Sequence, residues 1–164
     1  MKQIAAVELE RCYALADLLD TVPDKDFDIR CWVGRRELGR KTMLFGMIET
    51  HPGCGFAGCA IGWAAHCDIF PGFYIDSNGS IVYDPEPGRV YKQKNWHAVM
   101  TVMGINQDMA EYLFYPNGYK LDATPAMVAE RLRRFASKIA AIRARDRRKV
   151  AAPVLVQRKL ELVA

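Results

Sequence analysis

Three of the five cysteines and two of the three histidines of this chain lie between His51 and Cys67. Thiolates and imidazoles bind zinc, and a thiol beside an imidazole can act as a nucleophile. Cysteine is also one of the most frequently buried residue types. The segment therefore fits three interpretations, which are a zinc site, a reactive thiol and a closely packed core helix.

The zinc interpretation depends on which of these side chains can converge. Cys59 and His66 lie seven residues apart, which is about 10 Å along the axis of the expected helix at ~1.5 Å per residue. Ligands at roughly 2.0–2.3 Å from one ion cannot bridge that separation. The candidate metal ligands are therefore His51, Cys54 and Cys59. A fourth ligand would have to come from Cys12, Cys31 or His97. Because the paired short spacings of common zinc sites are missing, we expect no cofactor and keep zinc as the alternative.

The thiol interpretation makes Cys59 the nucleophile of a hydrolase or transferase. Cys59 is expected near the N-terminus of a helix, where the helix dipole and free N–H groups lower the pKa of a thiol. His51 or His66 would serve as the base, with Asp68 to orient it. These three residues, Cys59, His51 and His66, are the catalytic candidates of the enzyme alternative.

The core-helix interpretation rests on the small residues that surround Cys59. Glycine and alanine dominate residues 57–65, with Ile61 and Trp63 as the large side chains. Each glycine costs a helix about 1 kcal/mol relative to alanine, so close packing of neighbouring backbone has to compensate. We favour this interpretation, which assigns no catalytic residue and no metal ligand, and a protein that is not an enzyme.

Residues 54–64 also carry a resemblance to a family. They read Cys54-Gly-Phe-Ala-Gly-Cys59-Ala-Ile-Gly62-Trp63-Ala64. This segment resembles a Cys-Gly-Thr-x-Ala-Cys-x-x-Gly-Trp-Ala signature of small uncharacterised proteins of bacteria and their phages. Residues 27–32 are similar to the Phe-Asp-Met-x-x-Trp segment that precedes the signature in that family, and the whole resemblance covers about residues 27–116. The chain departs from the signature at Phe56 and Gly58. The resemblance implies a phage or bacterial origin and no particular reaction.

Periodicity and turn residues predict an α+β fold that is predominantly helical, with a helical core and one β-hairpin near 73–84. Asn78-Gly79 suits a type I′ turn between the two strands. Asn95, Asn106 and Thr124 are expected to cap helices, with Gly104 ending one of them. The predicted helices cover residues 3–20, 37–49, 56–67, 96–103, 107–114 and 125–149. We expect one globular domain over residues 1–150, followed by a C-terminal tail or strand over residues 151–164.

The net charge of +4 conceals an uneven distribution. Residues 1–124 contain 12 Lys or Arg and 16 Asp or Glu, whereas residues 125–164 contain 11 and 3, so the two parts carry −4 and +8. A basic end of this kind attracts anionic partners, although a solvated helix face would also be polar. The expected contact residues are Arg134, Lys138, Arg143, Arg145, Arg147, Arg148 and Lys149.

Other features narrow the class of protein. No apolar run approaches the roughly 18 residues of a membrane span, and the odd number of cysteines fits reduced thiols. Phosphate-binding glycine loops, the nucleophile-elbow motif and the zinc-protease helix motif are missing from the sequence. We therefore expect a cytoplasmic protein of a bacterial or phage-infected cell with no membrane partner. It would bind a host or viral macromolecule, either a protein or a nucleic acid, through the basic C-terminal helix.

Overall fold

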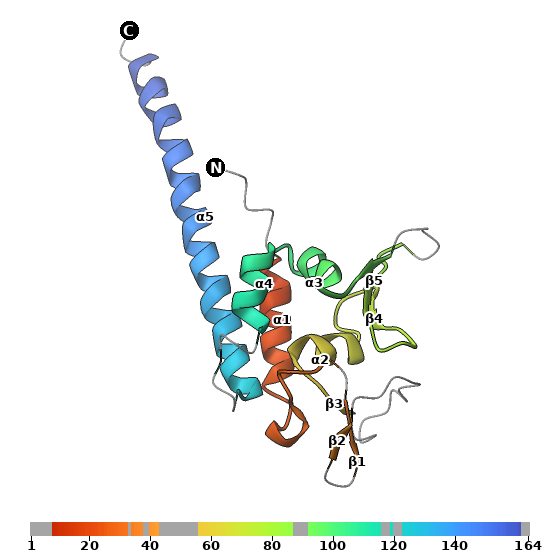
Figure 1. Ribbon diagram of the computed structural model, residues 1–164. Helices are drawn as coiled ribbons and strands as arrows, with labels where there is room; N and C mark the ends of the chain where they lie inside the picture. Colours follow the sequence, from red (N-terminus) through yellow and green to blue (C-terminus); the bar gives the residue numbers. More distant parts are fainter. Residues whose placement is uncertain are drawn as a thin grey trace.

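The computed structural model describes residues 8–32, 34–37, 40–42, 56–86, 92–115, 119 and 123–161, with the backbone alone for residues 34–37, 40–42, 56 and 149–161. The fold is α+β and predominantly helical, as predicted (Figure 1). The helices are α1 (Leu9–Leu19), α2 (Ala60–His66), α3 (Asn95–Met103), α4 (Gln107–Phe114) and α5 (Pro125–Glu161), with a short 3₁₀ helix at Asp24–Asp26. The strands are β1 (Gly34–Glu37), β2 (Arg40–Thr42), β3 (Phe56–Ala57), β4 (Phe73–Ile75), β5 (Ile81–Tyr83) and β6 (Gln93–Lys94).

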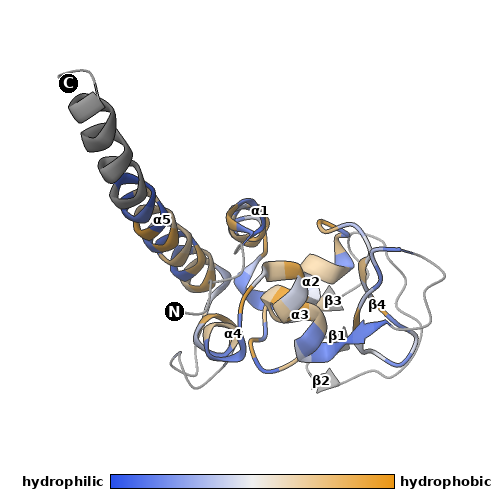
Figure 2. Ribbon diagram, turned by 90° about the horizontal axis from the view of Figure 1, so that it is seen from above, coloured by the Kyte–Doolittle hydropathy of each residue, from blue (hydrophilic) through white to orange (hydrophobic). Residues whose placement is uncertain are grey.

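Helix α1 lies at the centre of the helical core, in contact with α2, α3 and α5. Its inner face consists of Cys12, Leu15, Ala16 and Leu19, all of which are buried. Viewed from above, α1, α4 and α5 stand together on one side, and α2 and α3 separate them from the strands (Figure 2). The core therefore joins a layer that contains α1, α4 and α5 to a layer that contains α2, α3 and the small sheets (Figure 2).

Helix α5 begins at the predicted N-cap, where the backbone N–H of Met127 donates to the hydroxyl of Thr124 at 3.3 Å. Its buried stripe includes Val128, Leu132 and Ile139. With 37 residues, the helix is about 55 Å long at ~1.5 Å per residue. Its C-terminal half extends beyond the other elements (Figure 1).

The helical conformation continues to Glu161, so the prediction of a tail or strand after residue 150 is wrong for residues 151–161. Propagation of an existing helix adds one hydrogen bond for each residue that it fixes. Residues 151–161 are also rich in strong helix formers, namely alanine, leucine, glutamine, arginine, lysine and glutamate. These preferences outweigh Pro153 and the valines around it.

Helices α3 and α4 form the predicted helical hairpin. Gly104 ends α3 with φ 63°, in the left-handed region that favours glycine. Asn106 caps α4, since its side chain accepts a hydrogen bond from the N–H of Met109 at 2.9 Å. The expected cap at Asn95 is wrong. This residue is itself the first of α3 with φ 55°, and Lys94 occupies the N-cap position without a side-chain hydrogen bond.

The predicted hairpin is present as β4 and β5, and β6 pairs with β5 to give a three-stranded antiparallel sheet. The turn is not type I′, because only Gly79 of the Asn-Gly pair has a positive φ, at 74°. The side chain of Asp76 explains the difference. Its Oδ1 atom accepts hydrogen bonds from the N–H groups of Asn78 and Ser80, both at 2.9 Å, which stabilises a three-residue loop closed by a left-handed glycine.

A second small sheet replaces part of the helix predicted over residues 37–49. Strand β1 pairs antiparallel with β2 and with β3, so residues 37 and 40–42 are extended, while residues 43–49 lie outside the described part of the chain. Charged residues of this segment have good helix propensity, but the antiparallel pairing of β1 with β2, in which Glu37 lies opposite Arg40, overrides that preference. Strand β3 also shortens the helix predicted over residues 56–67, because α2 begins at Ala60.

Candidate functional site

Cys59 occupies the N-cap position of α2, as the thiol interpretation requires, but its surroundings do not activate it. Its side chain is buried, and its backbone N–H donates to the carbonyl oxygen of Cys31 at 2.7 Å. Burial raises the pKa of the thiol to about 12 and outweighs the backbone N–H groups of Ile61 and Gly62, which lower it. The thiol is therefore protonated at neutral pH, and a protonated thiol is a poor nucleophile.

His66 is the last residue of α2, at the opposite end of the helix from Cys59. Its ring packs edge-on against the ring of Trp63, with 5.7 Å between the centroids, and burial lowers its pKa. Asp68 follows in an exposed turn with φ 50°. The separation along α2 is about 10 Å at ~1.5 Å per residue, so the helix does not bring Cys59 and His66 together.

The remaining members of the cluster, His51 and Cys54, lie outside the described residues. Among the residues that the structure does describe, no group of three or more histidine, cysteine, aspartate or glutamate side chains is placed to hold a metal ion. The fourth-ligand candidates are spread over separate elements, with Cys12 buried in α1, Cys31 in the loop beside Cys59 and His97 exposed on α3. The trio His51, Cys54 and Cys59 stays a sequence-based hypothesis.

The prediction that residues around Cys59 form a buried, closely packed helix is confirmed for α2. Ala60, Ile61, Ala64 and Ala65 are buried. Gly62 lies directly against the backbone of Trp32, since a Cβ atom at residue 62 would be only 1.6 Å from the carbonyl oxygen of Trp32. A side chain of any size is excluded there, which accounts for glycine within a helix.

These environments predict the order in which the thiols react. Among the four cysteines that the structure describes, we expect iodoacetamide at pH 8 to modify Cys67 of the folded protein first, because it is exposed, and the half-buried Cys31 more slowly. Cys12 and Cys59 are buried, with pKa values raised to about 11 and about 12, and should react only after denaturation. Peptide mapping by mass spectrometry over time gives the order. Fastest modification at Cys59 would contradict this prediction and revive the thiol enzyme.

The basic residues of α5 fall into two groups, and the first group holds the fold together. Arg133 donates to Asp17 of α1 at 2.7 Å and to Asp20, the C-cap residue of α1, at 2.6 Å. The hydrogen bond from Arg133 lowers the pKa of Asp20. Arg131 donates to the carbonyl oxygen of Tyr112 at 2.8 Å, and its guanidinium carbon lies 3.4 Å from the ring centroid of Tyr119. These two arginines join α5 to α1 and to the chain around α4.

The second group contains the expected contact residues. Arg134, Lys138, Arg145, Arg147 and Arg148 are exposed, and Arg143 is half-buried. Arg134 forms an ion pair with Glu130 one turn earlier. Within the described part of the chain, no hydrogen bond or ion pair involves Lys138, Arg145, Arg147 or Arg148. Lys149 belongs to the helix, but its side chain lies outside the described residues.

A pocket of about 390 Å³ between α3 and α4 was not predicted from the sequence. Its lining residues are Lys94, Asn95, Trp96, His97, Met100, Gln107, Ala110, Glu111 and Tyr115. Tyr115, the aromatic residue directly after the predicted helix 107–114, is a sequence signal that could have pointed to this place. Hydrophobic periodicity predicts which residues are buried and which are exposed. It does not predict a pocket between two helices, because the pocket depends on how far apart the ends of those helices lie.

Comparison of the chain with protein-family models, curated proteins and solved structures finds no match. In the described part of the chain, no helix combines the length and the apolar character that crossing a bilayer requires.

Proposed function

We propose that this protein is a non-enzymatic accessory protein of a phage or mobile element that acts in the bacterial cytoplasm. It binds a host or viral macromolecule through the basic part of α5. The setting rests on the resemblance of residues 27–116 to small bacterial and phage proteins, and the binding surface rests on the arrangement of charge along α5.

The proposal rests on a difference between two groups of cations on α5. Arg131 and Arg133 are engaged with the body of the protein, whereas Arg145, Arg147 and Arg148 are exposed on the part of the helix that extends away from it (Figure 1). Stability of the fold accounts for the first group. It does not account for a dense cluster of guanidinium groups beyond Ile139, the last buried residue among the side chains of α5 that the structure describes.

Helical geometry places several of these cations on one face. At roughly 100° per residue, Arg134, Lys138, Arg145 and Arg148 fall within an arc of about 80°. The arc lies on the opposite side of α5 from the buried residues Leu132 and Ala136. From Arg134 to Arg148 this basic face extends over about 21 Å at ~1.5 Å per residue. An extended row of guanidinium groups suits a polyanion or an acidic protein surface.

The enzyme alternative, a hydrolase or transferase that uses Cys59 with a nearby histidine, has less support. Burial of Cys59 and the raised pKa of its thiol work against nucleophilic attack at neutral pH. The basic face of α5 has no role in that alternative.

Affinity capture tests the proposal. The tagged protein is incubated with lysate of a bacterial host, with and without nuclease, and the bound fraction is analysed for proteins and nucleic acids. One stoichiometric protein that survives nuclease, or nucleic acid that nuclease removes, is the expected result and identifies the partner class. Turnover of a substrate that disappears on Cys59→Ala would overturn the proposal.

A further inference from the structure

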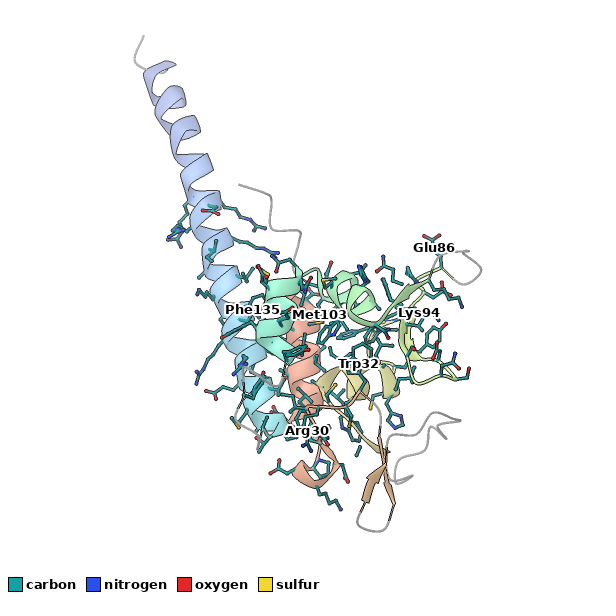
Figure 3. The ribbon with its side chains drawn as sticks, in the orientation of Figure 1. Arg30, Trp32, Glu86, Lys94, Met103 and Phe135 are labelled. Carbon is teal, nitrogen blue, oxygen red and sulfur yellow. The ribbon has the colours of Figure 1, made fainter. Side chains whose placement is uncertain are left out.

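The pocket between α3 and α4 has a defined apolar wall that does not depend on the basic face of α5. The rings of Trp96 and Tyr115 lie 6.0 Å apart between centroids and are inclined by 33°. The ring of Trp32 packs edge-on against the ring of Trp96, with 5.7 Å between the centroids. The backbone of Trp32 in turn lies against Gly62 of α2. Figure 3 shows Trp32 below α3, inside the body of the protein. This support from the core fixes the indole of Trp96 before any ligand enters.

The floor and rim of the pocket differ in polarity. Met100 and Ala110 contribute apolar surface, and Ala110 is almost fully buried. Gln107 and Glu111 stand one turn apart on α4, and the amide of Gln107 donates to Oε1 of Glu111 at 2.8 Å. A carboxylate has about four acceptor sites, so this hydrogen bond orients Glu111 and leaves it able to accept others.

The charges around the pocket favour a cation. Lys94 lies on β6 at the edge of the pocket, where its ammonium group is 3.5 Å from the carboxylate of Asp76 (Figure 3). That contact offsets the positive charge of Lys94. Glu111 has no counter-ion among the described residues, since its one hydrogen bond comes from a neutral amide. The remaining ionisable group of the lining is His97, which is exposed on the first turn of α3.

We propose that this pocket binds a cationic group carried on an apolar stem, either a guanidinium or an alkylammonium. The cation is recognised by the carboxylate of Glu111 and the faces of Trp96 and Tyr115, because an aromatic face attracts cations. The stem lies against Met100 and Ala110. A guanidinium fits especially well, since it stacks on aromatic rings and donates two parallel hydrogen bonds to a carboxylate.

Binding of arginine analogues to the whole protein tests this site at pH 8, where histidine is normally neutral. The probes are N-acetyl-arginine amide and its uncharged isostere N-acetyl-citrulline amide, titrated while amide signals are followed by ¹H–¹⁵N NMR. We expect arginine to shift the signals of Trp96, Glu111 and Tyr115. We expect it to bind at least about fivefold more tightly than citrulline.

Matched variants separate the site from a general charge effect. Glu111→Gln should weaken arginine binding by about fivefold, whereas Asp108→Asn, which removes a charge from the same helix outside the pocket, should leave it unchanged. Equal affinity for arginine and citrulline, or equal loss in the two variants, would overturn the proposal. A five-residue peptide with a central arginine distinguishes the sources of the ligand. Tighter binding than the single amino acid indicates a peptide, and equal binding indicates a free small cation.

Discussion

Gly62→Ala is expected to destabilise the protein severely, although alanine is the better helix former. The new Cβ atom would lie 1.6 Å from the carbonyl oxygen of Trp32 and 2.7 Å from its carbonyl carbon, so backbone has to move. The gain in helix propensity is about 1 kcal/mol, whereas overpacking a core costs about 1–3 kcal/mol and more where the obstacle is backbone. We expect a net loss of at least about 3 kcal/mol, with a fall in Tm of roughly 10 °C for a chain of this size.

Calorimetry or thermal circular dichroism measures this effect, and Ala65→Gly provides the matched control. It removes one methyl group from the same helix, so it should cost only about 1–2 kcal/mol in propensity and packing. A Gly62→Ala variant as stable as the native protein would show that α2 and the loop at Trp32 are not in contact.

Removal of the distal arginines should have the largest effect on partner binding. In the variant Arg143→Ala/Arg145→Ala/Arg147→Ala/Arg148→Ala, four cations disappear from the segment just beyond the buried part of α5. At about 0.5–1 kcal/mol for each charge contact, affinity for the captured partner should fall by at least about 30-fold at low salt. Alanine is the best helix former, so the helix itself should persist.

The charge-preserving variant with lysine at the same four positions is the control. If the partner is recognised mainly through its charge, the lysine variant should regain most of the affinity. If recognition depends on the geometry of the guanidinium group, the lysine variant should regain little. For a nucleic acid, the slope of log affinity against log salt should also become shallower by up to about 4 in the alanine variant. Unchanged binding in the alanine variant would exclude this part of α5 as the contact surface.

Local sequence signals were sufficient for the elements whose ends are determined by neighbouring residues. Thr124 and Asn106 cap their helices and Gly104 ends α3, each through contacts that span four residues or fewer. The hairpin at β4 and β5 was predictable in the same way. Its turn type was not, because the side chain of Asp76 reorganised the loop.

Features that depend on distant residues were not predictable from local patterns. Strand β1 pairs with β3 some twenty residues later, and this pairing was not predicted, because no residue near Gly34 and Arg35 specifies a partner so distant in the sequence. For the candidate sites, the sequence placed Cys59 near the N-terminus of a helix, but the raised pKa of its thiol arises from burial by the rest of the core. The pocket lined by Trp96 and Glu111 likewise exists only once α3 and α4 are placed side by side.

The uninterrupted course of α5 couples the proposed binding surface to the stability of the core. A helical segment without tertiary packing has little stability of its own in water, because the first turn is costly to nucleate. The distal residues of α5 continue a helix that is already formed at residues 125–139. Packing against α1 and the ion pair of Arg133 with α1 stabilise that part of the helix. When the core unfolds, the distal segment no longer has a preformed helix to continue, so it unfolds as well. A partner that recognises the helical form therefore stabilises the whole protein through mass action, by about 2.7 kcal/mol at a hundred times its Kd. The helical form of the basic surface and the folding of the core are thus one coupled equilibrium.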